Sequence, residues 1–249
     1  MSKNCIITVD AGTSSLRSIA SWQDGTAFLR SSRRYQPQYA RPATVEQEPL
    51  TWTDALLLTL REVAEGLTAQ GLRPAAISLT SQRASVIPTN DKGEALHAAI
   101  MWQDKRSIPQ CETLQRTIGL QTIYARTGLR IDPYFSLPKM LWLKKTLPDV
   151  YGHASKLLGV QDYIAHFMTA RFITDWTQAS RTMLMDIHKH IWDPVLLEET
   201  GIEPSKLPEL CPPGYCIGGS QRSFLVLQVS LRGRRLFWLV ETSNAQHWG

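Results

Sequence analysis

The sequence predicts an α/β domain with a mixed β-sheet and flanking helices. Three strand-like runs joined by short turns come first, and helical and strand-like segments then alternate along the chain. This order is typical of a mixed sheet that helices cover. The chain has 249 residues, which is enough for one large domain or two modest ones with a hydrophobic core.

The first three runs have the lengths and apolar patterns of strands. A turn of small residues at 11–15 separates the first run from the second. Asp24 and Gly25 supply a hairpin turn before the third run. These strands are expected at residues 4–10, 16–22 and 27–35.

The next segment, residues 36–50, holds three prolines and is predicted to be a long loop. Thr53 is then expected to cap an amphipathic helix that ends near Gln70. The apolar residues of this helix recur at the three- and four-residue spacing of one helix face. They are Leu56, Leu60, Val63 and Leu67.

The rest of the chain alternates between short strands and helices. An apolar strand is expected at 75–81, a second extended segment at 84–90 and a short strand at 171–174. Asp193 is expected to cap a helix that ends at Gly201. Further helical segments are expected at 104–118, at 121–147 with an interruption at 130–134, at 158–170 and in a capped turn at 175–181. This order favours the ribonuclease H-like, or actin-like, fold class.

The composition is that of a folded soluble protein. Hydrophobic residues make up 43% and charged residues 20%, and no run approaches the ~18 apolar residues of a membrane helix. The N-terminus enters a strand without signal-peptide features, so a cytoplasmic location is expected. The cysteines lack metal-binding spacing and are expected to be free thiols. They are Cys5, Cys111, Cys211 and Cys216.

The formal net charge of +5 hints at a nucleic-acid partner, but most of it comes from the last part of the chain. Residues 221–249 hold four Arg and one Glu, which contribute +3 of that total. The excess is therefore not a basic face, and neither nucleic acid nor a membrane is expected as a partner.

The segment VDAGTSSLR, residues 9–17, has the features of a phosphate-binding turn. Backbone N–H groups and small hydroxyls of such a turn can surround a phosphate. Asp10 is a candidate Mg²⁺ ligand, because Mg²⁺ takes one or two carboxylates together with phosphate oxygens. Arg17 is a candidate phosphate contact, and an ordinary hairpin turn is the alternative. The turn consists of Gly12, Thr13, Ser14 and Ser15.

Polar residues at the end of the 75–81 strand point to a ligand with hydroxyl groups. Gln82 and Arg83 follow this apolar strand directly. Polar groups there are costly to bury without partners, and they are suited to hydrogen-bonding ligand hydroxyls. A solvated loop is the alternative.

Two aromatic residues are candidates for contact with a sugar or polyol. Trp102 offers a flat apolar face, and Tyr134 follows an Asp-Pro turn that can direct its ring into a cleft. Near Trp102, Asp104 and Arg106 either order the loop or contact the ligand. The alternatives are a core Trp before a helix cap and a loop Tyr packed on the domain.

Taken in order, these segments resemble the FGGY family of carbohydrate kinases, with glycerol kinases as the nearest branch. The resemblance covers residues 4–219. It rests on the segments 9–17, 81–83, 100–106, 127–139, 173–194 and 207–210.

The resemblance implies a two-domain actin-like kinase with ATP and Mg²⁺ in the cleft and a sugar or polyol hydroxyl as phosphate acceptor. Phosphate and metal contacts would come from the 9–17 segment: Asp10 (also the metal ligand), Gly12, Thr13, Ser14, Ser15 and Arg17. Substrate contacts would come from Gln82, Arg83, Trp102, Asp104 and Tyr134. Two departures leave the substrate open: Ala84 replaces the Glu of glycerol kinases, and residues 159–164 are nearer to ketose-type or other-sugar-type members.

The last part of the chain, 220–249, departs from the family and is predicted to be an out-of-frame tail after an N-terminal domain at 1–219. The family continues to a Gly-Asp-Gln segment whose Asp is the general base. Back-translating residues 234–249 and shifting the frame yields Thr-Pro-Val-Leu-Ala-Gly-Gly-Asp-Gln, so a frameshift near 217–224 is inferred. A divergent extension is the alternative.

This interpretation leaves no catalytic base in the chain and no second, nucleotide-binding domain. The chain alone is therefore expected to be inactive, and the alternative function is a non-catalytic binding or interaction protein. The β-prone windows 224–231 and 235–240 are expected to lack a partner strand and, with the open cleft face, to promote self-association. Truncation near residue 215 is expected to improve solubility.

Overall fold

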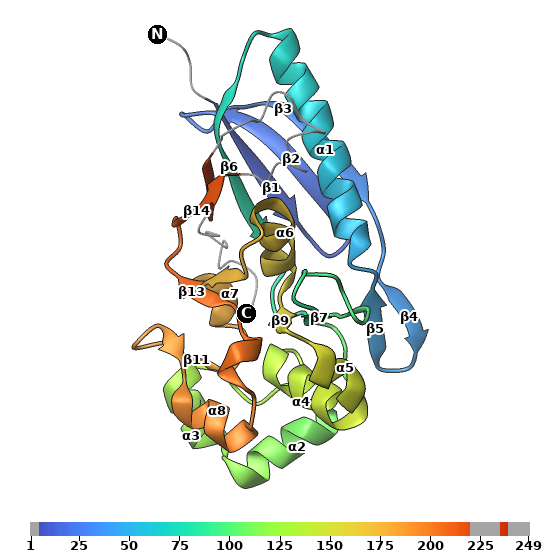
Figure 1. Ribbon diagram of the computed structural model, residues 1–249, viewed down its shortest axis with the longest axis vertical. Helices are drawn as coiled ribbons and strands as arrows, with labels where there is room; N and C mark the ends of the chain where they lie inside the picture. Colours follow the sequence, from blue (N-terminus) through green and yellow to red (C-terminus); the bar gives the residue numbers. More distant parts are fainter. Residues whose placement is uncertain (1–4, 220–234, 239–249) are drawn as a thin grey trace, which may run out of the picture.

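A computed structural model describes residues 5–219 and 235–238 of the chain. It contains a six-stranded mixed sheet at one end and a group of helices at the other (Figure 1). The sheet has the strand order β14-β15-β6-β1-β2-β3. Each end has its own cluster of buried hydrophobic residues.

The first three strands confirm the predicted pattern of hairpins. They are β1 (Cys5–Ala11), β2 (Ser15–Trp22) and β3 (Ala27–Arg34), which pair antiparallel in turn. Side chains of β1 alternate between buried and partly exposed, as a half-buried strand requires. The strand β6 (Pro74–Ser81) joins β1 in parallel, which makes the sheet mixed as predicted.

The segment 36–50 is not the long loop that its prolines suggested. It forms β4 (Gln38–Arg41) and β5 (Thr44–Gln47), and β5 pairs with β8 (Ala99–Ile100). The three prolines interrupt neither strand because each lies outside them. They are Pro37 before β4, Pro42 in the turn and Pro49 before the next helix.

The long helix α1 (Leu50–Ala69) packs against β2 and β3, and its predicted apolar face is buried. Thr53 does not cap it. The helix begins at Leu50 after Pro49, and the Thr53 hydroxyl donates to the Leu50 carbonyl from within the first turn. Proline tolerates this boundary because the first turn leaves backbone N–H groups unpaired in any case.

The other helices follow the predicted order, with α2 starting four residues later than expected. Asp175 and Asp193 cap their helices as predicted, and Gly201 ends the last one in the left-handed conformation. The helices are α2 (Ile108–Thr117), α3 (Leu120–Thr127), α4 (Ser136–Thr146), α5 (Pro148–His153), α6 (Val160–Thr169), α7 (Trp176–Ala179), α8 (Pro194–Thr200) and a 3₁₀ turn at Pro204–Lys206.

Short strands link these helices into the fold. Two of them, β7 (Ile87–Thr89) and β9 (Lys156–Leu158), pair antiparallel, and β10 (Ile173–Asp175) pairs in parallel with β13 (Glu209–Cys211). The others are β11 (Met185–Asp186) and β12 (Ile191–Trp192).

Part of the predicted tail belongs to the sheet. The strand β15 (Arg235–Trp238) pairs in parallel with β6 and antiparallel with β14 (Cys216–Gly219). The expectation that this window lacks a partner strand is therefore wrong for 235–238, because the open edge of β6 offers unpaired backbone groups to a β-prone segment. The window 224–231 and the rest of the tail lie outside the described residues.

All four cysteines lie in the described residues, and none of them forms a disulfide bond there, as predicted. Among the helices of residues 5–219, none is both long and apolar enough to cross a membrane.

Candidate functional site

Four sequence motifs meet in one pocket of about 360 Å³. Parallel pairing of β1 and β6 places Ala11 opposite Ser81, so the turns after both strands begin at the same sheet edge. The Gln82 amide donates to the Ala11 carbonyl at 2.9 Å and joins the two turns. Ligand sites of α/β sheets occupy such carboxyl edges. The pocket is lined by Asp10, Gly12, Thr13, Arg17, Ser81, Gln82, Arg83, Trp102 and Tyr134.

The turn between β1 and β2 is held tightly by its own backbone. The Gly12 amide donates to the Ser15 carbonyl at 2.9 Å, and a Cβ at Gly12 would meet that oxygen at 3.2 Å. The Tyr35 hydroxyl donates to the Gly12 carbonyl, and the Tyr35 amide donates to the Ser14 carbonyl. These contacts give the turn a single shape with a small residue at its tightest point.

Asp10 and Arg17 lie at the mouth of this turn and form an ion pair. They are directly opposite in the β1–β2 ladder, and Arg17 Nη2 lies 2.8 Å from Asp10 Oδ2. Their side chains are 35% and 54% exposed, so solvent or a ligand reaches both charges. The pair presents a hard carboxylate oxygen and a guanidinium side by side, which suits a magnesium phosphate.

Ser14 and Ser15 serve the turn and do not line the pocket. Their backbone carbonyls accept the bonds that close the turn, and the Ser14 side chain is exposed. The prediction that their side chains contact phosphate stays a prediction.

Thr13 connects three of the four motifs through one hydroxyl group. It donates to Gln82 Oε1 at 3.2 Å and accepts from Trp102 Nε1 at 3.0 Å. The Trp102 ring lies 5.5 Å from the Tyr134 ring at an angle of 58°, which is an ordinary tilted aromatic contact. The turn between β1 and β2 is thus tied to an aromatic wall of the pocket, which consists of Trp102 and Tyr134.

Asp104 is the predicted substrate contact that the structure places elsewhere. Its side chain is completely buried and is absent from the pocket wall. It accepts from the Val45 amide at 2.6 Å and from Arg106 Nε at 2.9 Å, and Arg106 Nη1 also pairs with Glu46 at 2.7 Å. These bonds order the loop around Asp104 and Arg106, and contact of either side chain with a ligand stays a prediction.

Sequence reasoning missed Lys139 in α4, which is completely buried. Its ammonium donates to the carbonyls of Pro133, Tyr134 and Phe135 at 2.6, 2.6 and 3.0 Å. The spacing of α4 could have revealed it, because Lys139 shares the buried helix face with Met140 and Leu143.

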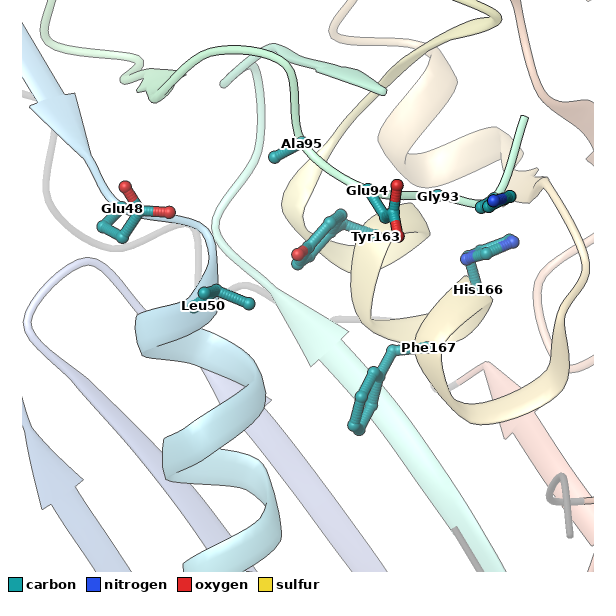
Figure 2. Close-up of a pocket in the computed structure, with 9 residues that line it drawn as sticks. Glu48, Leu50, Gly93, Glu94, Ala95, Tyr163, His166 and Phe167 are labelled. Carbon is teal, nitrogen blue, oxygen red and sulfur yellow. The ribbon is translucent and has the colours of Figure 1, made fainter. Parts of the chain in front are cut away.

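A second cavity, of about 480 Å³, lies between the start of α1 and the helix α6 (Figure 2). None of the candidate site residues lines it. In Figure 2, Glu48 and Leu50 stand on one side of it, and Tyr163, His166 and Phe167 of α6 on the other. The candidate chemistry therefore belongs to the smaller pocket.

A metal could be held in this pocket only with help from a ligand. Within residues 5–219, no group of three or more His, Cys, Asp or Glu side chains is arranged for a metal ion. Asp10 supplies one carboxylate, and Mg²⁺ commonly takes its remaining ligands from water and phosphate. The residues present thus fit Mg²⁺ carried by a nucleotide.

Comparison with known proteins identifies relatives over almost the whole described chain. The profile of the N-terminal domain of the FGGY family of carbohydrate kinases matches residues 5–227, which extends past the predicted boundary at 219. Glycerol kinases of Trichlorobacter lovleyi and Halorhodospira halophila are 34% and 36% identical over 238 and 222 residues. These alignments cover 92% and 85% of this chain but 47% and 43% of those proteins, so the chain spans about half the length of the curated relatives it matches.

Solved structures agree with the fold. Gluconate kinase from Lactobacillus acidophilus is similar with a TM-score of 0.87 and 25% identity, over 95% of this chain and 47% of that one. Xylulose kinase from Rhodospirillum rubrum is similar with a TM-score of 0.90 and 23% identity, over 95% and 49% of the two chains. The predicted actin-like fold class is thereby confirmed.

Proposed function

Because this chain belongs to the FGGY family of carbohydrate kinases, we propose that its pocket is one side of an active site that transfers the γ-phosphate of ATP to a sugar or polyol hydroxyl. The observation that carries this proposal is the meeting of four distant motifs in one pocket. Phosphoryl transfer depends chiefly on positioning and charge stabilisation, and this pocket offers groups for both.

On the phosphate side, the turn between β1 and β2 would bind the transferring phosphate. Its backbone N–H groups would face phosphate oxygens beside Thr13, whose hydroxyl proton is donated to Gln82, and Arg17 would offset the negative charge of these oxygens. Asp10 would hold Mg²⁺, which when bound neutralises charge that develops on the phosphates. The Asp10–Arg17 ion pair keeps both side chains at the pocket mouth before a ligand arrives.

On the substrate side, Gln82 and Arg83 would hydrogen-bond the hydroxyls of a sugar or polyol. Trp102 and Tyr134 would pack against its C–H surface. The Thr13 hydroxyl bonds both Gln82 and Trp102, so it would hold the acceptor hydroxyl at a set distance from the phosphate. Such orientation of two reactants is a large part of the rate enhancement of many enzymes.

The proposed substrate is given as a class, the sugars and polyols, and not as a single compound. The relatives reported above are named glycerol kinases, and similar solved structures are named gluconate, xylulose and glycerol kinases. Ala84 is buried and adopts a positive φ of 68°, and it replaces the carboxylate expected of a glycerol site. We therefore infer a sugar or polyol acceptor without choosing among these.

We further infer that this chain alone transfers phosphate slowly or not at all. The family's general base would come from a Gly-Asp-Gln segment that the tail lacks. Loss of a general base typically lowers the rate by ~10²- to 10⁴-fold. The alternative is a non-catalytic protein that still binds a sugar or phosphate in the pocket and associates through its open face.

Binding and activity measurements on the 249-residue chain test this proposal. Arg83→Ala should weaken binding of glycerol or D-xylulose by about 10-fold or more, as expected for a lost charged hydrogen bond, and should leave MgATP binding unchanged. Asp10→Asn should weaken MgATP binding and leave binding of glycerol or D-xylulose unchanged. Arg116→Ala is the matched control, because Arg116 is exposed on α2.

Two results would contradict the assignment. One is an effect of Arg83→Ala on MgATP binding alone. The other is turnover by the unaltered chain at ordinary kinase rates of about 1–100 s⁻¹ that Asp10→Ala abolishes, since it would show that the missing segment is not needed. The nucleotide sequence that encodes residues 210–249 tests the frameshift directly.

A further inference from the structure

We propose that Lys139 is a positioning residue for the substrate side of the pocket, because its ammonium fixes the backbone that carries Tyr134. This inference rests on the proposed function only for the identity of the ligand. The positioning itself rests on contacts within this chain.

The ammonium of Lys139 matches its surroundings in number and geometry. It donates to three consecutive carbonyls, those of Pro133, Tyr134 and Phe135, at 2.6 to 3.0 Å. A protonated amine has three N–H donors and a neutral amine has two. Protonation therefore allows the amine to donate to all three carbonyls, and deprotonation leaves it two donors for three acceptors.

The same segment is held from its other side by Asp132. The Asp132 carboxylate accepts from the Tyr134 amide at 2.8 Å, and its carbonyl accepts from the Phe135 amide at 3.2 Å. Tyr134 is thus fixed at both its N–H and its C=O, and it lines the pocket. Lys139 supplies the carbonyl half of this support.

Burial makes the charge of Lys139 sensitive to pH near neutrality. Removal from water lowers the pKa of Lys139 to about 7, and the nearby groups Asp104, Cys111 and Asp132 act in the opposite direction. The Cys111 thiol stays protonated, because burial raises its pKa to about 12. The loop that carries Tyr134 should therefore be held more firmly at pH 6 than at pH 8.5.

The ring of Tyr134 faces Trp102 at a centroid distance of 5.5 Å. Trp102 also donates to the Thr13 hydroxyl, which lies in the turn between β1 and β2. Loosening of the Tyr134 backbone would therefore let the Tyr134 ring move away from Trp102 without disturbing the turn between β1 and β2. Affinity for a sugar or polyol should fall, and affinity for MgATP should not.

Hydrogen exchange on the whole chain tests the positioning without any ligand. The protection factors of the Tyr134, Phe135 and Leu137 amides should fall about 10-fold between pH 6 and pH 8.5, as expected for the loss of one hydrogen bond. Amides of β1 should keep their protection. Unchanged protection at Tyr134 and Phe135, or an equal loss in β1, would overturn the proposal.

Two variants separate charge from packing. Lys139→Met keeps an unbranched apolar chain without donors and should show the weakly protected loop at both pH values. Lys139→Arg stays charged and should keep most of the protection at both. Lys145→Met, at an exposed position on the same helix, is the matched control. The proposal would be overturned if amide protection of this loop in Lys139→Met still changed with pH as it does in the unaltered chain.

Binding of glycerol and D-xylulose at pH 6 connects the loop to the pocket. Lys139→Met should weaken binding of the probe by about 10-fold and leave MgATP binding unchanged. If the unaltered chain binds neither probe, the proposed substrate class fails, while the exchange data still decide the positioning. If Lys139→Met does not fold, the positioning role is decided by the pH comparison on the unaltered chain and by Lys139→Arg.

Discussion

Replacing Asp104 with alanine should lower the stability of this protein rather than affect a ligand contact. Asp104 is completely buried and accepts from the Val45 amide and from Arg106. Arg106 is itself 9% exposed, so removing the carboxylate leaves a buried cation with Glu46 as its remaining charged partner. Breaking a buried pair in this way costs about 3–5 kcal/mol.

The lower end of that range applies, because Glu46 still lies 2.7 Å from the Arg106 guanidinium. We expect a loss of about 3 kcal/mol for Asp104→Ala and a smaller loss of about 1–2 kcal/mol for Asp104→Asn, which keeps one oxygen acceptor. In a domain of this size, 3 kcal/mol corresponds to a fall of roughly 6–12 °C in Tm.

Urea unfolding followed by far-ultraviolet circular dichroism measures this effect. Asp91→Ala is the control, because Asp91 is exposed in a turn and its loss should change stability by less than about 0.5 kcal/mol. The reasoning fails if Asp104→Ala leaves the free energy of unfolding unchanged but abolishes sugar or polyol binding. That result would return Asp104 to the substrate-binding role that the sequence suggested.

Three further outcomes are expected. Thr13→Val removes the hydrogen-bond acceptor of Trp102 Nε1. It should therefore change the fluorescence of Trp102 and weaken glycerol binding about 10-fold. An unchanged fluorescence spectrum would refute this. Burial raises the pKa of Asp162 to about 7, above its unfolded value, so its contribution to stability should be lost as the pH rises from about 4 to 7. Urea unfolding of Asp162→Asn should lack this loss, and parallel pH curves would contradict the argument. Truncation near residue 215 removes β14 and β15 and uncovers the edge of β6. The soluble fraction on expression should therefore fall, whereas the sequence alone suggested that it would rise.

Local signals in the sequence predicted much of the fold. The first hairpins follow from alternating apolar residues and small-residue turns, and the caps at Asp175 and Asp193 follow from side chains that bond amides two and three residues away. These features depend on neighbours in the chain, so spacing alone indicates them. The segment 36–50 escaped prediction, because β5 pairs with β8 some fifty residues later.

The sequence by itself determined which four motifs are candidates for the site, because each motif is a local arrangement of residue types. The tertiary structure alone decided how they meet. The bonds from Thr13 to Gln82 and Trp102 span 69 and 89 residues, and Asp104 finds the Val45 amide 59 residues away. Burial then separates Asp104 and Lys139, which support the site from within, from Arg17 and Tyr134, which reach the pocket. Such partners depend on the packing of the whole chain, and no local pattern encodes them.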